Sequence, residues 1–112
     1  MGIPNPANYI DATIANAATT SGAINLEGKK LVGIEIPASF TGATVSFTQC
    51  RSEGGTYIPV YNDDGSLYSV TATDAAYVRV NPAVFAGCAF IKVVSASSES
   101  GEKVVTVVCI DL

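Results

Sequence analysis

The side chains that could do chemistry in this chain are few, and the densest group is the Asn-Asp-Asp-Gly run at residues 62–65. Its two carboxylates, Asp63 and Asp64, are adjacent in a predicted turn, so their side chains point apart instead of facing one substrate bond. The run could offer oxygens to calcium, but the alternate-residue spacing and closing glutamate of an EF-hand loop are missing. Histidine, the commonest general base and metal ligand, is absent from the chain. We therefore expect a turn here, with no catalytic residue and no metal.

Cys50, Cys88 and Cys109 are the second group of reactive side chains. They are odd in number and far apart, and without a Cys-x-x-Cys pair or a histidine they do not form a zinc site. No histidine can activate Cys50, and neither Gly-x-Ser-x-Gly nor Gly-x-Gly-x-x-Gly occurs. The apolar surroundings of Cys88 and Cys109 favour thiols that fill the core, as suits a chain made in a reducing cytoplasm; a disulfide is the alternative. The sequence predicts neither an enzyme nor a bound cofactor.

Four tyrosines near predicted hairpins form the third group, namely Tyr57, Tyr61, Tyr68 and Tyr77. Aromatic faces can stack on the C–H surfaces of sugars while neighbouring Asn or Asp side chains bind the hydroxyl groups, so a glycan platform is one interpretation. Tryptophan is absent, however, and tyrosines in strands more often pack across strands or form interfaces. Packing or assembly is the favoured interpretation, and glycan binding stays open.

The charge pattern limits the partners. Charged residues make up 14% of the chain and hydrophobic residues 48%, with a formal net charge of −4. Surface charge usually prevents unwanted association, and this chain has little of it. We infer that part of the surface is covered by a partner or by copies of the same chain. The six cations are scattered, which argues against nucleic-acid binding. No apolar run approaches the ~18 residues of a membrane span, and the first residues do not resemble a signal peptide.

The elements that must position these groups are short β-strands. Runs of β-branched and aromatic residues are separated by Gly, Asn, Asp and Ser clusters at intervals of roughly 8 to 12 residues, and no segment keeps a helical apolar period. The pattern predicts an all-β fold, an antiparallel β-sandwich of jelly-roll type with about eight strands. The strand-forming segments are residues 10–20, 23–26, 31–36, 43–50, 56–61, 66–71, 76–80, 88–95 and 103–110.

Individual residues predict local details of this sandwich. Alternation in the segment 43–50 points Val45 and Phe47 inward. Pro59 indicates a sheet edge or a bulge, because proline cannot donate to a strand ladder. Gly65 follows an aspartate and suits a positive φ in a turn.

The two ends of the chain are predicted to differ. Pro4, Pro6 and two asparagines within residues 1–9 indicate an extended N-terminal arm, because these residues disfavour regular structure. Residues 10–112 then form a single sandwich domain, with one helical turn expected at residues 82–86.

Five segments, taken in order, resemble small virion proteins of tailed phages, and in size and strand layout the capsid decoration (cement) proteins of epsilon15-like podoviruses. The segments are residues 31–38 (LVGIEIPA), 43–47 (ATVSF), 55–57 (GTY), 60–65 (VYNDDG) and 85–93 (FAGCAFIKV). The resemblance covers residues 22–110. Its motifs are structural and none is catalytic.

The resemblance implies a cement protein on the outer surface of the virion. Such a protein binds the major capsid protein lattice, associates with itself as a homo-dimer or homo-trimer, and stabilises the head. The side chains expected to form the interfaces are Tyr9, Ile10, Tyr57, Pro59, Tyr61 and Tyr68. The alternative is a head-fibre or tail-associated module that binds host glycan through the hairpin tyrosines.

Overall fold

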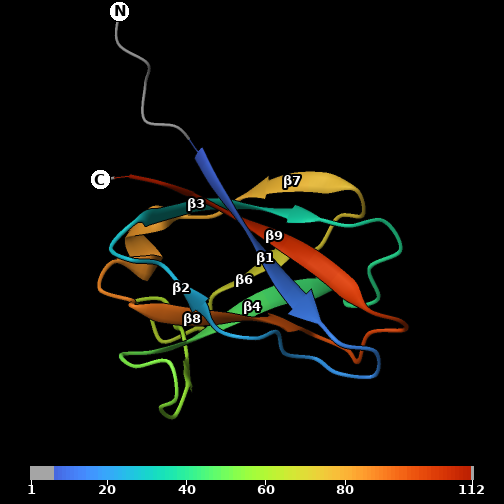
Figure 1. Ribbon diagram of the computed structural model, residues 1–112, viewed down its shortest axis with the longest axis horizontal. Helices are drawn as coiled ribbons and strands as arrows, with labels where there is room; N and C mark the ends of the chain where they lie inside the picture. The colour runs from blue at the N-terminus through green and yellow to red at the C-terminus, as the bar shows by residue number, and fades with distance from the viewer. Residues whose placement is uncertain (1–6, 112) are drawn as a thin grey trace, which may run out of the picture.

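The computed structural model describes residues 7–111 and shows two antiparallel β-sheets packed face to face (Figure 1). Sheet A contains, in spatial order, β1 (Ala7–Ile14), β9 (Lys103–Ile110), β3 (Lys30–Ile36) and β7 (Ala76–Arg79). Sheet B contains β2 (Ile24–Asn25), β8 (Phe90–Ser95) and β4 (Thr44–Cys50), and both β5 (Ile58–Pro59) and β6 (Ser69–Thr71) pair with β4. The predicted all-β sandwich is confirmed.

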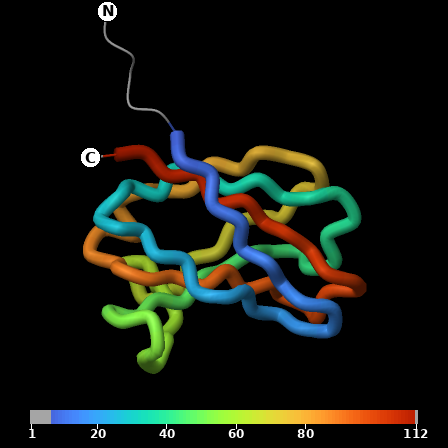
Figure 2. The backbone as a smooth tube through the Cα atoms, viewed as in Figure 1, coloured from blue at the N-terminus to red at the C-terminus, as the bar shows by residue number. Residues whose placement is uncertain are grey.

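The strand pairing is that of a ribbon folded back on itself and then rolled up. Along the ribbon, β1 pairs with β9, β2 with β8, β3 with β7, and β4 with β5 and β6. Rolling the ribbon brings β3 against β9 and β4 against β8. This winding gives the jelly roll that the sequence predicted. Figure 2 shows that this winding brings the two ends of the described chain together, with the blue start of β1 beside the red end of β9.

The core lies between the two sheets and is built from alternate residues of their strands. Val45 and Phe47 are fully buried, which confirms the inward alternation predicted for residues 43–50. Phe85 enters the same core from a 3-10 turn, η1 (Pro82–Phe85), where the sequence predicted a helical turn. Its ring meets that of Phe47 edge-on, with 4.9 Å between the centroids, a favourable aromatic geometry.

Strand β1 begins earlier than the sequence predicted. Ala7, Asn8 and Tyr9, which were assigned to the extended arm, pair with β9 at the other end of the described chain. Their local composition disfavours a strand, but the long-range ladder to β9 supplies backbone partners that composition does not reveal. The rest of the expected arm, residues 1–6, lies outside the described residues.

The strand at residues 56–61 is shorter than predicted. Only Ile58 and Pro59 form β5, at the edge of sheet B, where Pro59 was expected. The chain then continues through an isolated bridge between Tyr61 and Leu67 before β6 begins. Residues 7–111 contain nine strands, one for each of the nine predicted strand-forming segments and one more than the approximate total of eight.

Candidate functional site

Four exposed residues, Ile58, Pro59, Tyr61 and Leu67, lie along the hairpin at the edge of sheet B, and we call them the hairpin patch. Tyr61 and Leu67 face each other across their antiparallel bridge, so their side chains lie on one face. The exposed fractions are 54% for Ile58, 55% for Tyr61 and 45% for Leu67. Clustered apolar side chains that stay in water are typical of interaction sites.

The turn that carries the patch is closed by its own polar groups. The amide of Asn62 donates to the carbonyl of Ser66 over 2.7 Å, and the amide of Gly65 donates to the carbonyl of Asn62 over 3.0 Å. Gly65 has a φ of 88°, the left-handed conformation predicted for it. Asp64 Oδ1 accepts bonds from the hydroxyl and the amide of Ser66, which lower the pKa of this carboxyl. The run at residues 62–65 is thus the predicted turn.

An open hollow of about 440 Å³ lies beside the patch, which is within the rough 300–1,000 Å³ range of small-ligand sites. It is lined by Tyr61, Asn62, Asp63, Asp64, Asn81, Ala83 and Val84. Amide and carboxylate groups thus converge near one exposed tyrosine. These groups could bind hydroxyl groups of a sugar.

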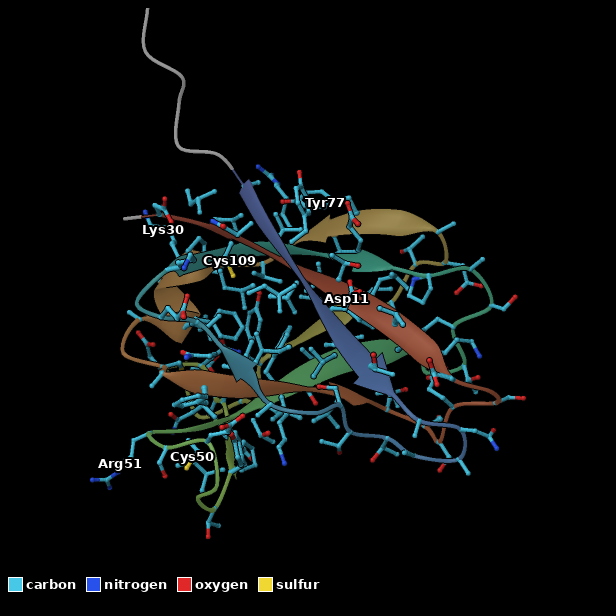
Figure 3. The ribbon with its side chains drawn as sticks, viewed as in Figure 1. Asp11, Lys30, Cys50, Arg51, Tyr77 and Cys109 are labelled. Carbon is cyan, nitrogen blue, oxygen red and sulfur yellow. The ribbon has the colours of Figure 1, made fainter. Side chains whose placement is uncertain are left out.

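The outer face of sheet A carries a second group of tyrosines. Tyr9 on β1 is 65% exposed and lies opposite Val108, of which only 4% is exposed. Tyr77 on β7 lies over Gly33 of β3, and a Cβ atom at Gly33 would overlap the hydroxyl end of the Tyr77 ring. Glycine is therefore required there for the tyrosine to lie against the sheet. Figure 3 shows Tyr77 and Asp11 on the strands at opposite edges of sheet A.

Two of the predicted interface tyrosines, Tyr57 and Tyr68, are only partly exposed and are held by contacts within the chain. Tyr57 is half-buried, donates its hydroxyl to the carbonyl of Glu53 over 2.8 Å, and has Lys92 Nζ 4.4 Å from its ring centroid. Partial burial raises the pKa of Tyr57, and the charge of Glu53 adds to the effect. Tyr68 is half-buried and packs edge-on against Phe85, with its hydroxyl accepting a bond from the amide of Asn81.

The structure therefore divides the six predicted residues among three places. Pro59 and Tyr61 belong to the hairpin patch and are both exposed. Tyr9 and Ile10 lie on β1, at an edge of the other sheet, with Ile10 packed against the core. Tyr57 and Tyr68 are held by contacts within the chain. Ile58 and Leu67 were missed, although their position beside Tyr61 in an apolar hairpin was a usable signal.

The three cysteines are free thiols. Cys50 and Cys109 are buried, as expected of core-filling residues, and Cys88 is half-buried. Burial raises the pKa of both Cys88 and Cys109, which disfavours the reactive thiolate. Within residues 7–111, no three His, Cys, Asp or Glu side chains converge in a group that could hold a metal ion.

A buried carboxylate with several hydrogen bonds, Glu99, was not singled out by the sequence. Its side chain is buried and accepts bonds from the amides of Thr41 (2.9 Å) and Gly42 (3.0 Å). The hydroxyl of Ser95 donates to it over 2.6 Å, and Lys103 Nζ lies 3.9 Å away. Burial by itself would raise the pKa of Glu99, but the hydrogen bonds outweigh it and lower the pKa. We call these residues the Glu99 cluster; they join two loops at one end of the sandwich.

Comparison with known proteins gives a likeness in structure and no match in sequence. No family model matches the chain, and no curated protein matches its sequence. Among solved structures, the chain is similar to the crystal structure of SPBc2 prophage-derived protein YomS, with a TM-score of 0.57 and 18% sequence identity. The match covers 99% of this chain and 100% of that chain. At this identity the likeness shows a shared fold. Among the described residues, no helix is long and apolar enough to cross a membrane.

Proposed function

We propose that this protein is a structural protein of a bacteriophage virion, and that it decorates the capsid by binding the outer surface of the major capsid protein lattice. The observation that carries the proposal is the hairpin patch, in which Ile58, Tyr61 and Leu67 stay exposed on a well-packed jelly roll. The fold is shared along its whole length with a prophage-derived protein, which favours a phage origin. The sequence resemblance to decoration proteins supports the same role.

The patch binds through side chains, not through strand pairing. Pro59 has no N–H to donate, so the β5 edge is a poor template for another strand. Burying the exposed parts of three large apolar side chains contributes roughly 1 kcal/mol for each. A single patch therefore binds weakly, and linking copies, as in the homo-dimer or homo-trimer expected from the sequence, lets several patches engage neighbouring lattice sites at once. Area covered between neighbouring capsid subunits then resists the internal pressure of packaged DNA.

The test is binding to expanded capsids assembled from the major capsid protein that the same genome encodes. Capsids are mixed with the purified chain, pelleted, and imaged by cryo-electron microscopy. Density for the jelly roll at regular positions on the outer lattice is the expected result. The double variant Tyr61→Ser with Leu67→Ser should lose at least about tenfold in affinity, while Tyr77→Ser, on the other sheet, should bind as before. Capsids bare of the chain at saturating concentration would contradict the proposal.

A second candidate function is a fibre- or tail-associated module that binds host glycan. The observation that favours it is the hollow, where Asn62, Asp63 and Asn81 converge beside Tyr61. A glycan array screened with the purified chain tests it. A hit that Asn81→Ala abolishes, together with bare capsids, would favour this function over decoration. Asn81 also caps η1, so the variant's fold is checked by circular dichroism.

A further inference from the structure

Strand β1 lies at the edge of sheet A. It pairs with β9 without interruption from Ala7 to Ile14 and forms the end of sheet A, so its other flank faces no strand among the described residues. Figure 1 shows it crossing the front of the molecule. The strand has no proline, no lysine and no bulge, the devices that usually prevent an edge from pairing with another chain. Its one charge is Asp11.

We propose that β1 pairs antiparallel with β1 of a second copy, across a two-fold axis at Ile10. The pairing joins two four-stranded A sheets into one continuous sheet. It is isologous, since each copy offers the same edge to the other. The inference concerns the isolated chain and does not depend on the virion role.

The charge of Asp11 selects the register. In an antiparallel pair, residues directly opposite each other lie on the same face. The two-fold axis of a symmetric pair therefore lies midway between the two copies of one residue, which face each other. An axis at Asp11 would put two carboxylates opposite each other, which is destabilising. An axis at Tyr9 would leave fewer residues of β1 paired. An axis at Ile10 pairs residues 7–13 of both copies and keeps the carboxylates apart.

The contacts made in this register are complementary on both faces. On the outer face, Tyr9 of each copy lies opposite Asp11 of the other, so the tyrosine hydroxyl is within reach of a carboxylate twice in the dimer. On the inner face, Ile10 meets Ile10 of the second copy. Ile10 is half-buried against the core in one copy, and the second copy covers the rest of it. The free N–H and C=O groups of both edges gain partners.

Cysteine cross-linking tests the register directly. In a Cys88→Ser background, which removes the half-buried native thiol, Ile10→Cys places two thiols opposite each other, about 5 Å apart at Cβ. Thiol oxidation should convert this variant to a covalent dimer. The matched control is Thr13→Cys, because Thr13 lies opposite Ala7 in this register and the two introduced thiols would be about 20 Å apart. Cross-linking of Thr13→Cys without Ile10→Cys, or of neither variant, would overturn the proposal.

Charge at position 9 gives an independent test on a highly exposed side chain. Tyr9→Asp puts two pairs of like charges across the axis, whereas Tyr9→Lys puts two pairs of opposite charges there. We expect sedimentation velocity to show a Kd for dimerisation at least about tenfold weaker for Tyr9→Asp than for Tyr9→Lys. The same two changes at Tyr61, on the other sheet, should leave the Kd unchanged. Equal Kd values for the Tyr9 variants, or a chain that stays monomeric at all concentrations, would overturn the proposal.

Discussion

The loops at the two ends of the sandwich are held by hydrogen bonds of different reach. At one end, Glu99 joins its own loop to amides at Thr41 and Gly42, which are 58 and 57 residues away in the sequence. The amide of Gly101 donates to Asn16 across 85 residues at the same end. At the hairpin end, the side-chain bonds of residues 53–66 connect partners no more than four residues apart.

The two ends therefore have different roles: the Glu99 end stabilises the fold, and the hairpin end carries the proposed binding surface. Bonds between distant segments form only in the folded chain, so the Glu99 cluster adds directly to the free energy of unfolding. Bonds within one turn shape the hairpin locally and contribute less to the whole fold. The hairpin also leaves Ile58, Tyr61 and Leu67 in water. A surface under little structural demand can be adapted to a partner without unfolding the protein.

Loss of the Glu99 charge should give the largest effect. Glu99→Gln keeps the shape of the side chain, but its NH₂ group must face a hydroxyl or an amide donor, so the cluster loses acceptors. We expect the free energy of unfolding to fall by about 2–4 kcal/mol. Urea denaturation followed by fluorescence or circular dichroism measures it. Glu53→Gln, an exposed glutamate at the hairpin end, is the matched control and should change stability by less than about 0.5 kcal/mol.

Acid should weaken the same end of the molecule. Because the folded pKa of Glu99 lies below the ordinary value of 4.5, its contribution to stability is present above that pH and is lost as the pH falls toward the folded pKa. Thermal melting between pH 6 and the acid range should show this loss in the native chain. Glu99→Gln should show a shallower decline over the same range. Parallel curves for the two proteins would show that Glu99 does not carry the dependence.

A change in the hairpin turn should give the smallest effect on stability. Asp64→Ala removes the two bonds from Ser66, both within an exposed turn. We expect only a small loss, well below that of Glu99→Gln, measured by the same urea denaturation. The comparison between the two ends would fail if this loss equalled that of Glu99→Gln.

The parts of the fold that were predictable from sequence are those with local causes. Alternation around Val45 and Phe47 predicted β4, and residues 82–86 were predicted as the helical turn that is η1. Gly65 marked the hairpin turn and Pro59 marked the edge. In each case a residue constrains its own backbone or faces its own strand neighbours, so the sequence window contains the cause.

The parts that were missed depend on distant residues. Glu99 lies in a run of serines and glycine that predicts an exposed turn, and nothing local shows that two amides of another loop will enclose it. Ala7 joined β1 because of a ladder to Ile110. The flat placement of Tyr77 depends on Gly33 in the neighbouring strand. Of the site, Tyr61 was predictable as an aromatic in a hairpin, whereas its grouping with Leu67 required the bridge between them.

The rolled ribbon also has a consequence for folding kinetics. Strand β9 occupies the interior of sheet A between β1 and β3, and Asp11 on β1 faces Thr106 on β9 across 95 residues of sequence. Sheet A cannot close until these remote segments find each other, and the entropy of that search is lost before most native contacts can compensate for it. Refolding is therefore expected on the slow scale of milliseconds to seconds, with amide exchange slowest along β9, because opening that strand disrupts both of its neighbours at once.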